Sequence, residues 1–136
     1  MIALVDANAL YAAADQSDSH HEVALAELRR PELSLVLPAL PVAEAAYLIG
    51  DRLGPNAEAA FARGIAEFDI ELPTLDDWRR IADLVEQYAD FPLGAADASI
   101  VALAERLRTD LVITFDRRHF SAVRPRHCAA LHLLPE

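Results

Sequence analysis

The chain has 136 residues, of which 22 are acidic and 12 basic, so its formal net charge is −10 at neutral pH. This length suits one domain with its own core, and the single cysteine, Cys128, excludes an intramolecular disulfide. All twelve basic residues are arginine, which excludes mechanisms that need a lysine, such as P-loop nucleotide hydrolysis and Schiff-base chemistry. No apolar run approaches the roughly 20 residues that cross a bilayer, and the start MIALVD does not resemble a signal peptide. We therefore expect a single cytoplasmic domain over residues 1–136, with no membrane contact.

In the first half of the chain, short apolar runs alternate with longer stretches whose apolar residues recur with helical spacing. The elements predicted here are, in chain order, a strand at Ile2–Val5, helices at Ala7–Ala14 and Ser19–Arg30, a strand at Leu33–Leu37, and helices at Pro41–Leu53 and Asn56–Glu67. Pro31 ends the second helix because proline cannot continue one. Pro41 and Pro55 are placed to open the next two helices, since a proline in the first helical turn loses no hydrogen bond.

The second half of the chain repeats this alternation. Its predicted elements are a strand at Phe68–Leu72, a helix at Thr74–Tyr88 with Thr74 as N-cap, a helix at Ala95–Arg108, a strand at Leu111–Phe115 and a last strand at Ala130–Leu134. Strands that are separated by helices pair in parallel through right-handed crossovers. The sequence therefore predicts an α/β fold, a three-layer α/β/α sandwich around a mostly parallel sheet of about five strands.

Two acidic residues follow predicted strands directly. Asp6 comes after the first strand and Asp116 after the strand Leu111–Phe115, whose Thr114 lies two residues before Asp116 on the same strand face. Ligands of open α/β sheets bind at this carboxyl edge, so both acids, with Asn8 close to Asp6, are candidates for a site. Each aspartate is explained equally well as the N-cap of the helix that follows it.

Two further acids lie on predicted helices among apolar neighbours. Glu44 falls in about the first turn of the helix that Pro41 opens, where the helix dipole alone accounts for a glutamate. Asp97 shares one helix face with the apolar residues Ile100 and Val101, and a carboxylate beside a buried stripe is costly unless it is paired or bound to a metal. The competing interpretation of Asp97 is a helix that begins one turn later and is capped by this residue.

The carboxyl ends of parallel strands and the starts of the helices after them share one edge of a sheet, so the four acids are expected to converge there. Two carboxylates about 4 Å apart repel by about 4 kcal/mol at an effective dielectric constant of 20, so such a cluster needs cations. Oxygen ligands favour Mg²⁺ or Mn²⁺, and such ions activate water for phosphodiester hydrolysis. The five histidines show no metal-ligand spacing and are interpreted as surface or core residues.

Four motifs in this order, VDANAL, PVAEAAYL, FPLGAADASIVALAERL and VITFDRRHF, resemble those of the PIN-domain ribonucleases, in particular the VapC-type toxins of toxin–antitoxin pairs. The resemblance spans Ile2 to Phe120. It implies that the metal-binding and catalytic acids are Asp6, Glu44, Asp97 and Asp116, with Asn8 and Thr114 as accessory polar residues. It further implies a PIN-like sandwich, endoribonuclease activity that depends on Mg²⁺ or Mn²⁺, a homodimer, and inhibition by a cognate antitoxin protein.

The negative charge of the chain is unevenly distributed, which bears on RNA as a partner. Residues 106–136 carry six arginines and three acidic residues, a net charge of +3 in a chain of net charge −10. Arg117 and Arg118 directly follow Asp116 and are the candidates for contact with substrate phosphates. The alternative for both is a solvated surface arginine.

Two other function classes compete with a nuclease. A phosphatase-like phosphotransfer domain also begins with an aspartate after its first strand, but it would need a second aspartate where Asn8 stands and a lysine, which the chain lacks. A non-catalytic acidic binding module, in which the four acids only cap helices, predicts that Mg²⁺ or Mn²⁺ has no effect on stability.

Overall fold

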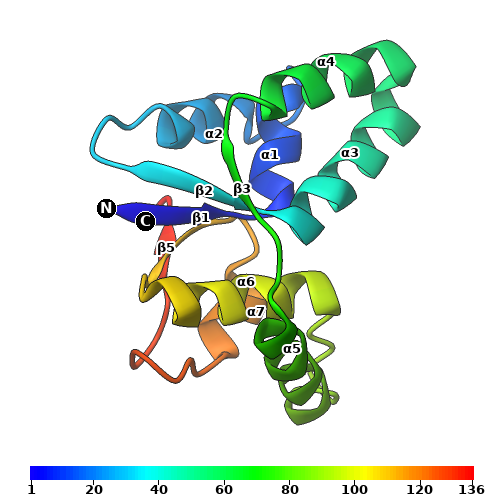
Figure 1. The fold of residues 1–136 in the computed structure, drawn as a ribbon. Helices are drawn as coiled ribbons and strands as arrows, with labels where there is room; N and C mark the ends of the chain where they lie inside the picture. The colour runs from blue at the N-terminus through cyan, green and yellow to red at the C-terminus, as the bar shows by residue number, and fades with distance from the viewer.

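The strands of the computed structural model, which describes residues 1–136, form one parallel sheet (Figure 1). They are β1 (Ile2–Val5), β2 (Ser34–Pro38), β3 (Asp69–Glu71), β4 (Leu111–Ile113) and β5 (His132–Leu134). The sheet order is β3-β2-β1-β4-β5, and every neighbouring pair is parallel. In the centre of the sheet, Leu4 of β1 is in register with Val36 of β2 and Val112 of β4. The predicted parallel sheet of about five strands is confirmed.

Helices cover both faces of this sheet. They are α1 (Ala7–Ala14), α2 (His21–Leu28), α3 (Ala39–Leu53), α4 (Pro55–Ile65), α5 (Leu75–Gln87), α6 (Ala95–Leu107) and α7 (Arg117–Ala122). Figure 1 shows α1 to α4 on one side of the sheet and α5 to α7 on the other. The predicted three-layer sandwich is therefore confirmed. None of the helices is both long and apolar enough to span a membrane.

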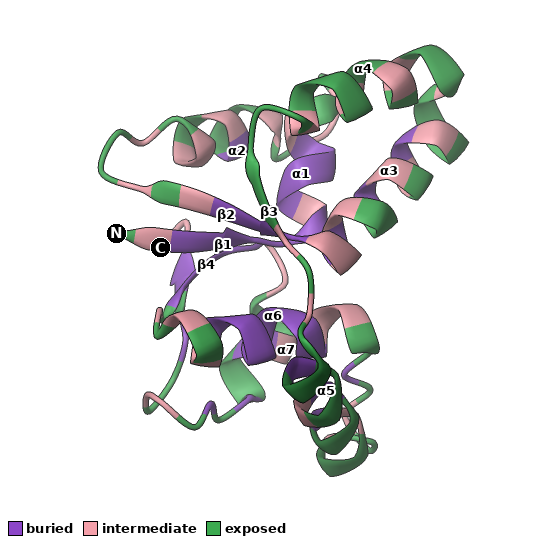
Figure 2. Ribbon diagram, in the orientation of Figure 1, coloured by how far each residue is buried: buried purple, intermediate pink, exposed green.

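Two apolar clusters, one on each face, explain the strongly apolar strands. Leu4 and Val112 pack with α5, α6 and α7 residues, whereas their neighbours Val5 and Ile113 pack with residues of α1 and α3. Side chains of a strand point alternately to the two faces, so a sheet covered on both sides needs apolar residues at every position. Figure 2 shows this burial in the central strands, α1 and α6, while α4 has no buried residue.

The predicted element bounds needed several corrections. Helix α3 begins at Ala39 and not at Pro41, because β2 runs on to Pro38, whose extended backbone makes it the N-cap. Pro41 is the third helical residue, still within the turn where no backbone donor is needed. Pro55 opens α4 as predicted. The edge strand β3 is shorter than predicted, with only three residues.

Candidate functional site

The four acids predicted to converge occupy two kinds of position. Asp6 follows β1 and is the N-cap of α1, and Asp116 follows β4 and is the N-cap of α7. Their interpretation as helix caps is therefore confirmed, and it does not exclude a role in a site. Asp97 lies in the first turn of α6, and Glu44 is the sixth residue of α3. Since β1 and β4 are neighbours in the sheet, Asp6 and Asp116 emerge at the same edge.

Asp6 is buried and uses its two carboxylate oxygens differently. Oδ1 accepts the capping hydrogen bond from the Ala7 backbone at 2.7 Å, and Oδ2 accepts one from the Thr114 hydroxyl at 2.8 Å. Thr114 is fully buried, and its oxygen also accepts from the Asp116 backbone at 3.0 Å and from the Asn8 side-chain amide at 3.3 Å. Thr114 therefore links the two strand-end acids, and together with Asn8 it holds Asp6 in one orientation.

Asp97 does not cap its helix. Helix α6 begins at Ala95 with Gly94 as the N-cap, so the alternative in which the helix starts one turn later is wrong. The half-buried carboxylate makes no side-chain hydrogen bond, yet ligand atoms of Asp97, Asp116 and His119 all lie within 4.8 Å of one another. This spacing allows a single cation to contact all three side chains.

The acids influence one another's protonation. Burial, and then the negative charges of Asp97 and Glu44, raise the pKa of Asp6 from 3.8 to about 7, although the hydrogen bonds from Thr114 and Ala7 oppose the shift. Burial, followed by the charges of Asp116 and Glu44, raises the pKa of Asp97 to about 6, against the opposing effect of His119. Because the ionised cluster is unfavourable by itself, a bound cation would stabilise it.

Glu44 differs from its predicted setting. It is exposed and lies in the second turn of α3, since the helix begins two residues earlier than predicted, and the first turn of α3 contains no acidic residue. Its interpretation as a partner of the helix dipole is therefore wrong. Its charge nevertheless acts on both Asp6 and Asp97, which places Glu44 at the rim of the cluster and outside its closest group.

The sequence did not indicate His119 as a site residue, because all five histidines were interpreted as surface or core residues. Its backbone N–H donates to Asp116 Oδ1 at 3.3 Å, and its Nδ1 lies 2.7 Å from Asp116 Oδ2. Because Nδ1 faces a carboxylate oxygen, we assign the ring proton to Nδ1, which leaves Nε2 free to accept. The signal was the Asp-x-x-His spacing at a helix start, which brings residues 116 and 119 to one side of the first turn.

The two arginines after Asp116 are both exposed, and neither forms an ion pair. Arg117 Nη1 donates to the Pro135 carbonyl at 2.8 Å, and the Arg118 guanidinium lies over the Phe91 ring, 5.4 Å from its centroid. His119 packs on the same Phe91 ring at 5.1 Å. The segment after β4 thus presents two cationic side chains beside the acidic cluster.

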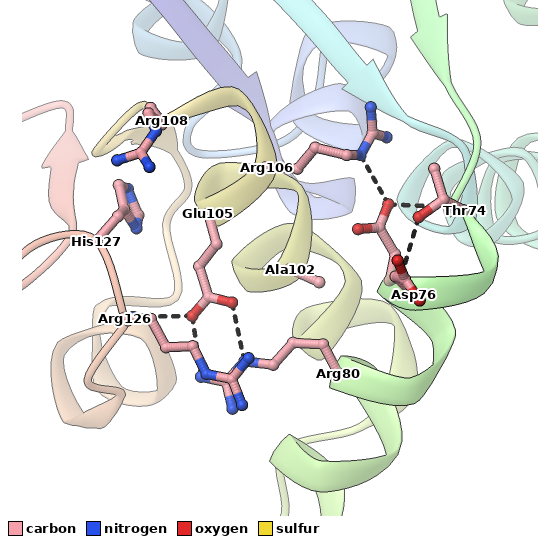
Figure 3. A pocket seen from close by; sticks show the side chains of 10 residues that line it. Thr74, Asp76, Arg80, Ala102, Glu105, Arg106, Arg108, Arg126 and His127 are labelled. Atoms are coloured by element: carbon pink, nitrogen blue, oxygen red, sulfur yellow. Dashed lines mark hydrogen bonds and ion pairs between the residues drawn. The ribbon is translucent and has the colours of Figure 1, made fainter.

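The largest pocket of the molecule lies elsewhere, between α5, α6 and the C-terminal segment (Figure 3). It has a volume of about 610 Å³, and none of the four acids lines it. Its walls hold two ion pairs that join α5 to α6, Arg80 Nε to Glu105 Oε1 at 2.8 Å and Arg106 Nε to Asp77 Oδ2 at 2.9 Å. These two ion pairs attach α5 to α6 along the pocket.

Comparisons with known proteins agree on one family. The PIN domain family matches residues 3–124 of the chain. Ribonuclease VapC26 of Mycobacterium tuberculosis is 37% identical over 124 residues, which cover 90% of this chain and 92% of that protein. Among solved structures, VapC20 of M. tuberculosis, a Sarcin-Ricin loop cleaving toxin, has a TM-score of 0.77 at 19% identity, covering 85% of this chain and 91% of that one. VapBC2 from Rickettsia felis, bound to a DNA fragment from its promoter, has a TM-score of 0.68 at 15% identity, covering 90% and 93%.

Proposed function

The chain belongs to the PIN domain family, among its VapC-type members, and from this premise we propose that it is an endoribonuclease and the toxin of a toxin–antitoxin pair. The observation that carries the proposal is Asp97, a carboxylate without a hydrogen-bond partner whose ligand atoms lie within 4.8 Å of those of Asp116 and His119. A carboxylate in this setting is costly to the fold unless a cation binds there.

The donor set fits Mg²⁺ or Mn²⁺ as the cofactor. Asp6, Glu44, Asp97 and Asp116 offer carboxylate oxygens, the ligands that these hard cations prefer. Burial, and after it the negative charge of the neighbouring acids, raises the pKa of Asp6 and of Asp97, and a bound cation would favour the ionised form of both carboxylates. When bound, the ion would activate water and stabilise the leaving oxygen of the phosphodiester.

The other residues of the site prepare these ligands and the substrate. Thr114 holds Asp6 and is itself held by Asn8, while His119 contacts both carboxylate oxygens of Asp116, so neither acid has to reorient when it binds a ligand. Arg117 and Arg118 provide the positive charge that an RNA backbone needs near an otherwise acidic site.

The direct test of the function is cleavage of single-stranded RNA by the purified protein with Mn²⁺, with Mg²⁺ and with a chelator. We expect cleavage with the ions and none with the chelator, together with a higher melting temperature in Mn²⁺ because the ion binds only the folded site. A protein that neither cuts RNA nor gains stability with any divalent ion would be the non-catalytic binding module, and the proposal would be abandoned.

Two apolar surfaces support the expected protein partners. One is a groove of about 290 Å³ between α1, α2 and α4, lined by Leu10, Leu25, Leu28, Phe61, Ile65 and Phe68, which suits an apolar segment of an antitoxin. The other is the edge of the sheet at β3 and the start of α5, where Ile70, Leu72, Leu75 and Trp78 are exposed, and which suits a second copy of the chain. Loss of RNA cleavage on adding the antitoxin tests the antitoxin as a partner. The molecular mass of the protein in solution tests whether two copies of the chain associate.

His119 offers a test of how Asp116 is positioned. In His119→Asn the side-chain amide can replace Nδ1 and donate to Asp116, whereas His119→Leu has no donor. We expect the leucine variant to cleave RNA about 10-fold more slowly at limiting Mn²⁺ and the asparagine variant to retain most of the activity, since partners of metal ligands contribute about 10–100-fold. Cleavage rates over a Mn²⁺ titration distinguish the two, and equal rates for both variants would show that the hydrogen bond to Asp116 is unimportant.

A further inference from the structure

A hollow of about 370 Å³ lies next to the acidic cluster, on the α2 side of the edge where β4 and β5 end. We propose that it binds one unpaired base of the RNA, which stacks on the exposed ring of His20. This inference rests on the proposed ribonuclease function and adds a substrate-binding subsite to it. The volume is within the range of about 300–1,000 Å³ that small-molecule sites occupy.

The hollow shares a wall with the candidate active site. Thr114 lines it and at the same time donates its hydroxyl to Asp6 Oδ2 at 2.8 Å. Along the segment that follows β4, Asp116 belongs to the acidic group, while Phe115 and Arg117 line the hollow. A nucleotide in the hollow would therefore place its neighbouring phosphate beside the acids.

Two stacked rings line the subsite. The rings of His20 and Phe115 have centroids 4.2 Å apart and planes inclined by 12°. Phe115 is half-buried, and its backbone N–H donates to Asn8 Oδ1 at 3.1 Å, which anchors its backbone. His20, the other ring of the stack, is exposed. Unpaired bases stack on histidine and phenylalanine rings in this way, with little dependence on sequence.

Helix stability does not account for a histidine at position 20. His20 is the N-cap of α2 but makes no side-chain capping hydrogen bond, and serine, threonine, aspartate or asparagine would each stabilise the helix start better. The only side-chain interaction of its ring is the stack on Phe115. The ring of His20 therefore contributes to the wall of the hollow and not to the capping of the helix.

Arg117 supplies the charge that a nucleotide in the hollow requires. One guanidinium nitrogen, Nη1, donates to the Pro135 carbonyl at 2.8 Å, which fixes the side chain at the rim. The other N–H groups remain available for a phosphate. The carboxylate in the wall, Glu136, lies 2.8 Å from His132 Nε2 and is engaged by that contact.

Two substitutions of His20 separate stacking from folding. His20→Phe keeps an aromatic surface, whereas His20→Ser removes it and supplies a better N-cap. With Mn²⁺ and a short single-stranded RNA, we expect His20→Ser to lower kcat/KM on the order of 10-fold, with a melting temperature equal to or above that of the parent. His20→Phe should retain most of the activity. Equal activity of the serine variant and the parent, or equal losses in both variants, would overturn the subsite.

The position of the base is found with RNAs that lack one base at a time. For the parent, kcat/KM should fall about 10-fold when the base is missing at one particular position of the RNA. For His20→Ser, removal of the same base should lower kcat/KM no further, because the ring and the base take part in one interaction. If the parent does not cleave RNA at all, the proposed function fails, and the subsite is then tested by binding alone. The fluorescence of 2-aminopurine in a single-stranded RNA should be quenched when the parent binds it and not when His20→Ser binds it. The same fluorescence with both proteins would refute the subsite.

Discussion

Asp97→Asn should lower metal-dependent RNA cleavage by at least about 1,000-fold while the fold is retained. Loss of one ligand charge removes several kcal/mol of charge stabilisation in the transition state, and each 1.4 kcal/mol changes the rate about tenfold. Asparagine has nearly the same shape, and the aspartate makes no side-chain hydrogen bond that the change could break. The rate is measured with saturating Mn²⁺ and one RNA oligonucleotide.

A matched control for this substitution is Asp83→Asn. Asp83 is an exposed aspartate of α5, in the layer that also contains α6, so its substitution removes the same charge away from the cluster. It should cleave RNA at the parental rate. If Asp97→Asn were as active as this control, Asp97 would have no role in the chemistry, and the convergence of acids would be structural only.

Asp6→Asn should remove the pH dependence that Asp6 gives to the stability of the metal-free protein. The folded pKa of Asp6 is about 7, above its ordinary value of 3.8, so between these values the folded state holds a proton that the unfolded state has released. Unfolding therefore becomes easier as the pH rises from about 4 to 7, and the full shift corresponds to roughly 4 kcal/mol. Asparagine carries no such penalty, but it loses one acceptor for Thr114 or Ala7, which costs about 1 kcal/mol.

Urea unfolding in the presence of a chelator measures this difference. Asp6→Asn should be more stable than the parent by about 2–3 kcal/mol at pH 7.5 and no more stable at pH 4. Mn²⁺ at pH 7.5 should stabilise the parent more than the variant. The ion neutralises the negative charge of Asp6 in the parent, and asparagine has no such charge. A difference between the two proteins that stays constant with pH would contradict the raised pKa of Asp6.

Local patterns in the sequence were sufficient for most of the fold. The strand Ile2–Val5 and the helix Ala7–Ala14 have the predicted bounds, because an apolar run that ends at a capping aspartate is a local signal. The start of α3 was predicted two residues late, since the β2 strand and its neighbours hold Pro38 in an extended backbone. Pairing within the sheet, which no local pattern reports, decided that boundary.

The charges of Asp97 and Glu44 act on Asp6, and those of Asp116 and Glu44 act on Asp97, but only the tertiary structure gave each of the four acids its environment. The sheet order places β1 beside β4, and the Thr114 hydroxyl can therefore reach Asp6 across 108 residues of chain. Residue spacing did not reveal that Glu44 is exposed, and the Asp-x-x-His spacing became informative only once Asp116 was known to begin α7. Helical and strand periodicities depend on neighbours a few residues apart, and they determined the layers and the candidate acids. Burial, charge interactions and the stacking of His20 on Phe115 depend on contacts between distant segments, and these only the folded chain decided.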